Sequence, residues 1–163
     1  MAPGNQRLHF RLGVVLDRMG ERHDSISHME KVIELDPDDA TALNYLGYTL
    51  AEMGVRLEEA EEFIRRALEL KPGDGYFTDS LGWVYFKMGR HKEALQWIQR
   101  ALESLPDDPL ITEHLGDTYA ALGRWKEAKQ AYERALRLGH ENPDQLETKL
   151  EESRKKANKQ VAP

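Results

Sequence analysis

The stretch Leu81–Ala94, LGWVYFKMGRHKEA, contains two glycines seven residues apart, with a dense apolar run between them. The first glycine, Gly82, interrupts a pattern that otherwise predicts a helix, where glycine costs about 1 kcal/mol relative to alanine. The four residues that follow it are all large and apolar, and a helix cannot turn four consecutive side chains toward one core. The stretch therefore raises two questions: why a glycine is kept here, and which way Trp83 points.

The Leu-Gly pair recurs along the chain at a nearly constant distance. The steps between pairs are 34, 35 and 34 residues, and the pairs are Leu12-Gly13, Leu46-Gly47, Leu81-Gly82 and Leu115-Gly116. Four further columns keep step with them: a second glycine (Gly20, Gly54, Gly89, Gly123), two columns of mostly small residues (Ser25, Ala60, Ala94, Ala128 and Val32, Ala67, Ala101, Ala135) and closing prolines (Pro37, Pro72, Pro106). A fixed period of this length indicates an array of repeats, each of them one supersecondary unit.

Each unit is predicted to be a pair of helices. Apolar residues four apart on either side of Gly89, such as Ala94 and Ile98, are typical of one buried helix face. Gly89 itself stands where the first helix is expected to end in a left-handed residue. We interpret Gly82 as a contact between the two helices of the pair, facing the small residue Ala94, so that the two backbones approach closely.

These columns resemble the tetratricopeptide repeat, and the third unit carries the whole pattern: Leu81, Gly82, Tyr85, Ala94, Ile98, Ala101 and Pro106. The resemblance covers about residues 6–142 and implies an all-α fold, a right-handed superhelical solenoid of antiparallel helix pairs with about nine helices and no strand. The expected units are 6–39, 40–74, 75–108 and 109–142, followed by a capping helix over 143–158 and a fraying tail over 159–163. The array departs from the pattern at Ser25 and Val32, at His140 in place of a closing proline, and at one extra residue near Val55.

Both ends of the array carry expectations of their own. Pro3-Gly4-Asn5 stands 34 residues before Pro37-Asp38-Asp39 and resembles the closing turn of a preceding repeat, so residues 1–5 are expected to end such a repeat. An ordinary chain terminus is the alternative. If a repeat precedes this stretch in the full protein, Leu8 and Val15 lack the second helix that would cover them. Exposed apolar patches of this kind favour association between copies of the chain.

The family resemblance implies a groove on the concave side of the array, lined by the first helix of each unit. The expected peptide-binding residues are Arg7, Phe10 and Val14, then Asn44 and Tyr48, then Tyr76, Asp79, Trp83, Phe86 and Lys87, then Leu110, Glu113 and Asp117. Trp83 is expected to point into this groove and to be largely exposed to solvent, whereas Tyr85 points into the core. The alternative is that these aromatic residues are surface or packing residues without a ligand.

One well-known subclass of the family grips chaperone C-termini with a clamp of lysine, asparagine and arginine side chains. The matching positions hold Phe10, Val14, Tyr45, Tyr76 and Ser80, or, one unit further along, Asn44, Tyr48, Ser80, Leu110 and His114. Neither set is a clamp, so this function is excluded.

The composition and motifs predict no chemistry. The net charge of −6 disfavours nucleic acid as a partner, cysteine is absent, and no segment approaches the length of a membrane-spanning helix. No signal peptide is recognisable at the N-terminus, and cytoplasm and periplasm both stay open. We expect no catalytic, cofactor or metal site: Ser25 is a packing position, and the pair His114 and Asp117 is interpreted as surface polarity rather than as a metal site.

The sequence therefore predicts a non-catalytic protein-interaction scaffold that holds a peptide segment or a partner protein in its groove. The alternative is a self-associating structural module, in which array ends stack or a C-terminal helix enters a neighbour's groove. An enzymatic function would need a further domain. The Leu-Gly-Tyr motif resembles motifs of bacterial multi-repeat proteins, including envelope lipoproteins that act as adaptors. The identity of the partner stays open.

Overall fold

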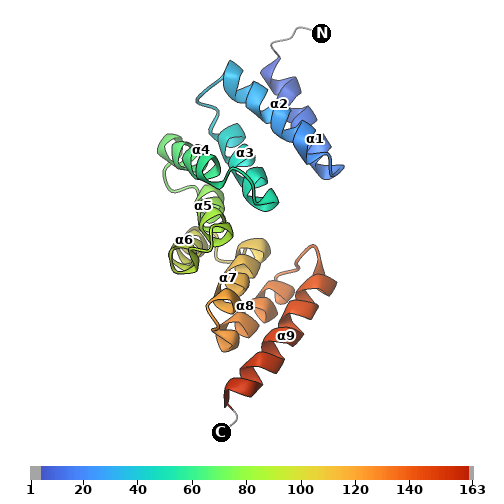
Figure 1. Cartoon of the computed structure of the whole chain (residues 1–163), viewed down its shortest axis with the longest axis vertical. Helices are drawn as coiled ribbons and strands as arrows, with labels where there is room; N and C mark the ends of the chain where they lie inside the picture. The colour runs from blue at the N-terminus through green and yellow to red at the C-terminus, as the bar shows by residue number, and fades with distance from the viewer. Residues whose placement is uncertain (1–4, 162–163) are drawn as a thin grey trace.

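The computed structural model describes residues 5–161, which form an all-α array of helix pairs (Figure 1). In this part of the chain there is no strand, and the helices are α1 (Gln6–Arg18), α2 (Arg22–Leu35), α3 (Ala40–Met53), α4 (Leu57–Leu70), α5 (Gly75–Lys87), α6 (His91–Ser104), α7 (Pro109–Ala121), α8 (Trp125–Arg137) and α9 (Pro143–Val161). Figure 1 shows the pairs following one another in a curved row, with the two ends of the chain at opposite ends of the row. The all-α expectation is confirmed. The Pro3-Gly4 turn expected at the start lies outside the described residues.

Capping residues explain where the first helix of each pair begins. Asp39, Asp74 and Asp108 each precede a first helix, and each carboxylate accepts a hydrogen bond from a backbone N–H of the following turn. Asn5 does the same for α1. An aspartate or asparagine in this position satisfies a backbone donor that would otherwise lack a partner. Gly89, with φ of +76°, takes the left-handed conformation expected after α5.

The extra residue of the second unit lies where the sequence places it. Between Gly54 and α4 the chain passes through Arg56, which has φ of +50° and is the one non-glycine residue with positive φ among residues 5–161. The Arg56 guanidinium donates hydrogen bonds to Glu59 and to Glu30 of the preceding unit. The inserted residue is therefore absorbed in the turn, and both helices keep their register.

The glycine of the Leu-Gly pair lies at the closest contact between the helices of each pair. A Cβ atom added to Gly82 would lie 2.7 Å from Ile98 Cγ1, closer than real Cβ atoms approach a neighbour, and 3.2 Å from Trp97 Cβ, which is a tight contact. The nearest atoms thus belong to Ile98, one turn beyond the predicted partner Ala94, so that detail of the prediction was wrong. Met29, Ile64 and Tyr132 cover the corresponding glycines of the other units.

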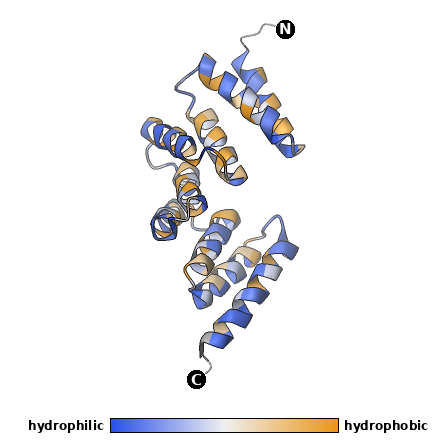
Figure 2. Cartoon of the chain, in the orientation of Figure 1, coloured by the Kyte–Doolittle hydropathy of each residue, from blue (hydrophilic) through white to orange (hydrophobic). Residues whose placement is uncertain are grey.

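The core runs along the array rather than through a centre. Leu46, Leu50, Leu81 and Val84 belong to one continuous cluster that crosses from unit to unit, as expected of a solenoid in which each unit packs on its neighbours. A second cluster joins Tyr132 to two leucines of α9, Leu146 and Leu150. Figure 2 shows α9 as mainly hydrophilic, and these two leucines pack it against the last pair. It extends to Val161, beyond the predicted end near residue 158.

Candidate protein-binding groove

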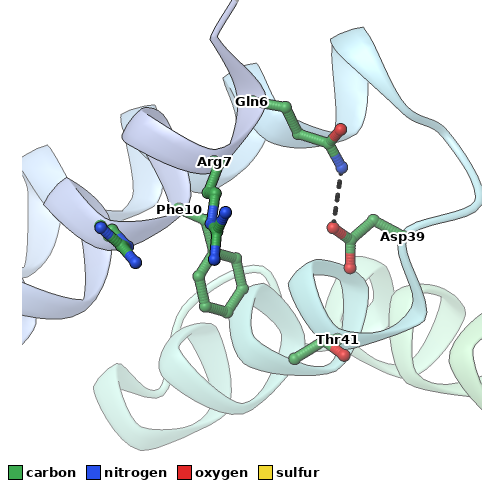
Figure 3. Close-up of a pocket in the computed structure, with 6 residues that line it drawn as sticks. Gln6, Arg7, Phe10, Asp39 and Thr41 are labelled. Atoms are coloured by element: carbon green, nitrogen blue, oxygen red, sulfur yellow. Dashed lines mark hydrogen bonds between the residues drawn. The ribbon is translucent and has the colours of Figure 1, made fainter.

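The first cavity of the groove lies between the N-terminal parts of α1 and α3 (Figure 3). It has a volume of about 540 Å³ and is lined by Gln6, Arg7, Phe10, Arg11, Asp39 and Thr41. The Gln6 amide donates a 2.9 Å hydrogen bond to the Asp39 carboxylate and fixes one side of the cavity. The Phe10 ring packs edge-on against Tyr45, 6.1 Å away between centroids. The sequence prediction had included Arg7 and Phe10 among these residues.

The second cavity continues along the same face, where α3, α5 and α7 meet. It has a volume of about 190 Å³ and is lined by Asn44, Tyr45, Tyr48, Tyr76, Asp79, Ser80, Asp108, Leu110 and Ile111. Five of the predicted groove residues are brought together here: Asn44, Tyr48, Tyr76, Asp79 and Leu110. Tyr76 is the most accessible of the aromatic residues named so far, with 58% of its surface exposed.

Trp83 is not the exposed groove residue that the sequence predicted. Only 7% of its surface is exposed, and its ring lies between the rings of Phe86 and His114, with centroid distances of 4.6 Å and 4.0 Å. The Trp83 indole N–H donates a 2.5 Å hydrogen bond to Glu52 on α3. The contacts of Trp83 with Glu52, Phe86 and His114, all on first helices, cover the side chain that was expected to face solvent. The expectation for Tyr85 is confirmed, because it is buried in the core.

The acidic residues Glu113 and Asp117, expected to line the groove, belong instead to an ion-pair cluster with α9, in which Glu113 is buried and Asp117 is half-buried. Lys149 of α9 donates to Glu113 at 2.7 Å and to both Asp117 oxygens at 2.7 and 2.8 Å, and His140 lies 2.7 Å from Glu113. Burial raises the pKa of Glu113, but Lys149 and His140 lower it by more, so the net pKa is below its usual value. These carboxylates are already paired within the molecule.

His114 also differs from the sequence prediction, which had placed it on the surface. Its side chain is buried and its ring lies 2.8 Å from the Asp79 carboxylate, whereas the predicted neighbour Asp117 contacts Lys149 and Tyr132. Burial lowers the pKa of His114, but the charge of Asp79 and its hydrogen bond raise it by more, so the net pKa is above 6.5. Among residues 5–161 no group of three or more acidic or histidine side chains is arranged to hold a metal ion.

The structure thus divides the predicted groove residues into two groups. Arg7, Phe10, Asn44, Tyr48, Tyr76, Asp79 and Leu110 line the two cavities, whereas Val14, Trp83, Phe86, Lys87, Glu113 and Asp117 line neither. Leu110 and Glu113 also border a cavity of about 310 Å³ between α7 and α9. Sequence reasoning missed Lys149, which pairs with Glu113 and Asp117; its place next to Leu150, a leucine of the apolar side of α9, is the signal in the sequence.

Two family models match the chain. The one described as tetratricopeptide repeat matches residues 5–75, and the one described as anaphase-promoting complex, cyclosome, subunit 3 matches residues 53–135. Together they span nearly all of the four helix pairs. No helix within residues 5–161 combines the length and the apolar character needed to cross a membrane.

Curated relatives match about half of the chain and a small part of their own length. A TPR repeat-containing protein of Pseudomonas aeruginosa is 42% identical over 76 residues, which cover 44% of this chain and 13% of that protein. Protein O-mannosyl-transferase Tmtc1 of Drosophila melanogaster is 36% identical over 74 residues, covering 44% of this chain and 9% of that protein. The crystal structure of MamA superimposes with a TM-score of 0.68 at 24% identity, over 88% of this chain and 83% of that one. This last likeness supports the fold.

Proposed function

The chain belongs to the tetratricopeptide repeat family, whose members bind protein partners, and on this premise we propose that it holds an extended segment of a partner protein along α1, α3 and α5. The proposed role is that of a non-catalytic scaffold, since the family and its fold are typically without chemistry of their own. Solenoids of this kind present extended concave surfaces for such segments.

The observation that carries the proposal is the arrangement of two cavities in series on the face made by the first helices. The cavity at Arg7 and Phe10 and the cavity at Asn44 and Tyr76 share α3 as their common wall. Each combines an aromatic surface with polar groups at its rim, which is the usual make-up of a site that binds and orients a ligand. An extended segment lying across α3 would place side chains in both.

The experiment is a selection of binders from a random peptide library on the full chain, followed by titration of a selected peptide. Phe10→Ala and Tyr76→Ala should each weaken binding by about tenfold or more, the scale of an aromatic anchor. Glu103→Gln, an exposed change on α6 outside both cavities, is the control and should leave the affinity unchanged. Selected peptides that bind all three variants as tightly as the parent would contradict the proposal.

Self-association is a second candidate, favoured by one observation. Leu12 and Val15 of α1 and Met19, its C-cap residue, follow one face and are 38%, 52% and 69% exposed, so they form an exposed apolar stripe. A second copy of the chain would cover this stripe. Light scattering over a range of protein concentrations tests it, and a constant monomer mass at high concentration would exclude it.

A further inference from the structure

We propose that the second cavity, between α3, α5 and α7, accepts a basic side chain, lysine or arginine, from the bound segment. The inference rests on the proposed function and specifies what the groove recognises at this point. Three features of the cavity carry it: aromatic walls, acceptor atoms without partners, and an excess of carboxylates.

The walls of the cavity present tyrosine rings. Tyr45, Tyr48 and Tyr76 all line it, and they come from two helices, so a side chain entering the cavity meets aromatic surface on more than one side. Ammonium and guanidinium groups are attracted to the faces of such rings. The volume of about 190 Å³ suits one side chain rather than a folded segment.

Two buried acceptor atoms in the lining residues have no hydrogen-bond partner. They are Asp79 Oδ1 and Asn44 Oδ1. Asp79 is only 4% exposed, and its other oxygen is occupied by His114 at 2.8 Å. Buried acceptors without partners are rare, since leaving them unpaired costs free energy. Both oxygens can accept a hydrogen bond from a ligand, and the polar groups of lysine and arginine side chains are donors only.

The charges around the cavity favour a cation. Its lining residues include two aspartates, Asp79 and Asp108, and no lysine or arginine. The field at Tyr48 has the same sign: burial raises the pKa of this hydroxyl well above its usual value, Glu52, Asp79 and Glu113 raise it further, and Arg22 alone lowers it. By contrast, Arg7 and Arg11 line the first cavity.

These features discriminate between ligand side chains. An acidic side chain would face Asp79 and Asp108 and would offer no donor to the unpaired oxygens. An aliphatic side chain would use the aromatic walls but would leave both acceptors unsatisfied. A basic side chain uses all three features, and its charge strengthens the hydrogen bonds it donates.

The test uses four peptides, acetyl-Ala-Ala-Xaa-Ala-Ala-amide with lysine, arginine, norleucine or glutamate at Xaa, titrated into the isotope-labelled chain by NMR. The lysine and arginine peptides should shift the amide signals of Asn44, Tyr76 and Asp79, and should bind about tenfold more tightly than the norleucine peptide. The glutamate peptide should cause no shift at these residues. Putrescine is titrated as a free amine without a peptide backbone.

Two variants and a control test whether the preference for basic peptides arises at the second cavity. Asp79→Asn removes a carboxylate charge from the cavity, but it also changes the contact with His114. Tyr76→Ala removes an exposed ring and should leave the packing intact. The second variant therefore tests the cavity independently of His114. Each should reduce binding of the lysine peptide by about fivefold or more. Glu103→Gln makes the same change in net charge at an exposed residue of α6 that does not line the cavity, and should have no effect.

Several results would overturn the inference. They are equal binding of the norleucine and lysine peptides, binding of putrescine as tight as that of the lysine peptide, or unchanged affinity in Tyr76→Ala. A chain that binds library-selected peptides without any preference for a basic residue would refute this inference and leave the proposed function standing. A chain that binds no peptide from the library would refute both.

Discussion

The two ends of the first-helix face differ in what their polar residues contact. At α1 and α3 the polar side chains border an open cavity, and Arg7, Arg11 and Thr41 are exposed. At α7 the acidic residues Glu113, which is buried, and Asp117, which is half-buried, form ion pairs with Lys149 of α9. Side chains of the first helices are therefore open to solvent at one end of this face and paired within the molecule at the other. The presence of a covering helix decides between these roles.

The largest effect is expected from Trp83→Ala, which tests whether the centre of this face is a structural core. Truncating a buried tryptophan should lower the free energy of unfolding by about 3–5 kcal/mol, since Trp83 stacks on Phe86 and His114 and bonds Glu52. Tyr76→Ala, which removes an aromatic side chain that is 58% exposed, is the matched control and should change the free energy of unfolding by about 0.5 kcal/mol at most. Urea unfolding measures both, and equal losses would contradict the distinction.

Lys149→Met should cause the next largest loss in the free energy of unfolding, because it removes the ion pairs that connect α9 to α7. Removing the ammonium leaves the carboxylates of Glu113, which is buried, and Asp117, which is half-buried, without the Lys149 donor, and a lost hydrogen bond to a charged group costs about 1.5–3 kcal/mol. Lys155→Met removes the same charge from an exposed position of α9 and serves as the control. Thermal melts at neutral pH compare them. A loss as small as that of the control would show that the ion pairs do not hold α9.

Gly82→Val tests the packing between the two helices of a pair, α5 and α6, rather than the contacts on the first-helix face. The added side chain would collide with Ile98, because a Cβ alone would come within 2.7 Å of it. Overpacking of this kind costs typically about 1–3 kcal/mol, and the loss should appear as a lower urea midpoint. A variant that melts like the parent would show that the two helices can separate freely.

The His114 and Asp79 pair should make stability depend on pH in the C-terminal half. Because the pKa of His114 is raised in the folded chain, chiefly by Asp79 against the opposing effect of burial, its contribution is complete below pH 6.5 and is lost as the pH rises through the folded-state pKa. The difference in unfolding free energy between the parent and His114→Gln should therefore shrink as the pH is raised. Urea titrations on both sides of neutrality measure it, and a constant difference would contradict the assignment.

Most of the fold follows from the sequence, because the repeat columns are packing residues whose spacing is set by helix geometry. The Leu-Gly columns, Gly89 and the insertion near Val55 all lie where the pattern predicts. The exposure of Trp83 and the role of His114 could not be predicted in the same way. Both depend on contacts between residues 31 or more apart, Glu52 with Trp83 and Asp79 with His114, and helix periodicity does not specify which side chains of neighbouring units cover one another.

The most direct test of the account is to map a library-selected peptide onto the chain by NMR. The central claim is that binding occurs on the open part of the face, at the two cavities, and not on the part tied to α9. We predict that the largest amide shifts fall at Phe10, Thr41, Asn44 and Tyr76, with the Trp83 indole and Lys149 little changed. Shifts concentrated at Trp83, Asp117 and Lys149, with the cavity residues unmoved, would contradict the account.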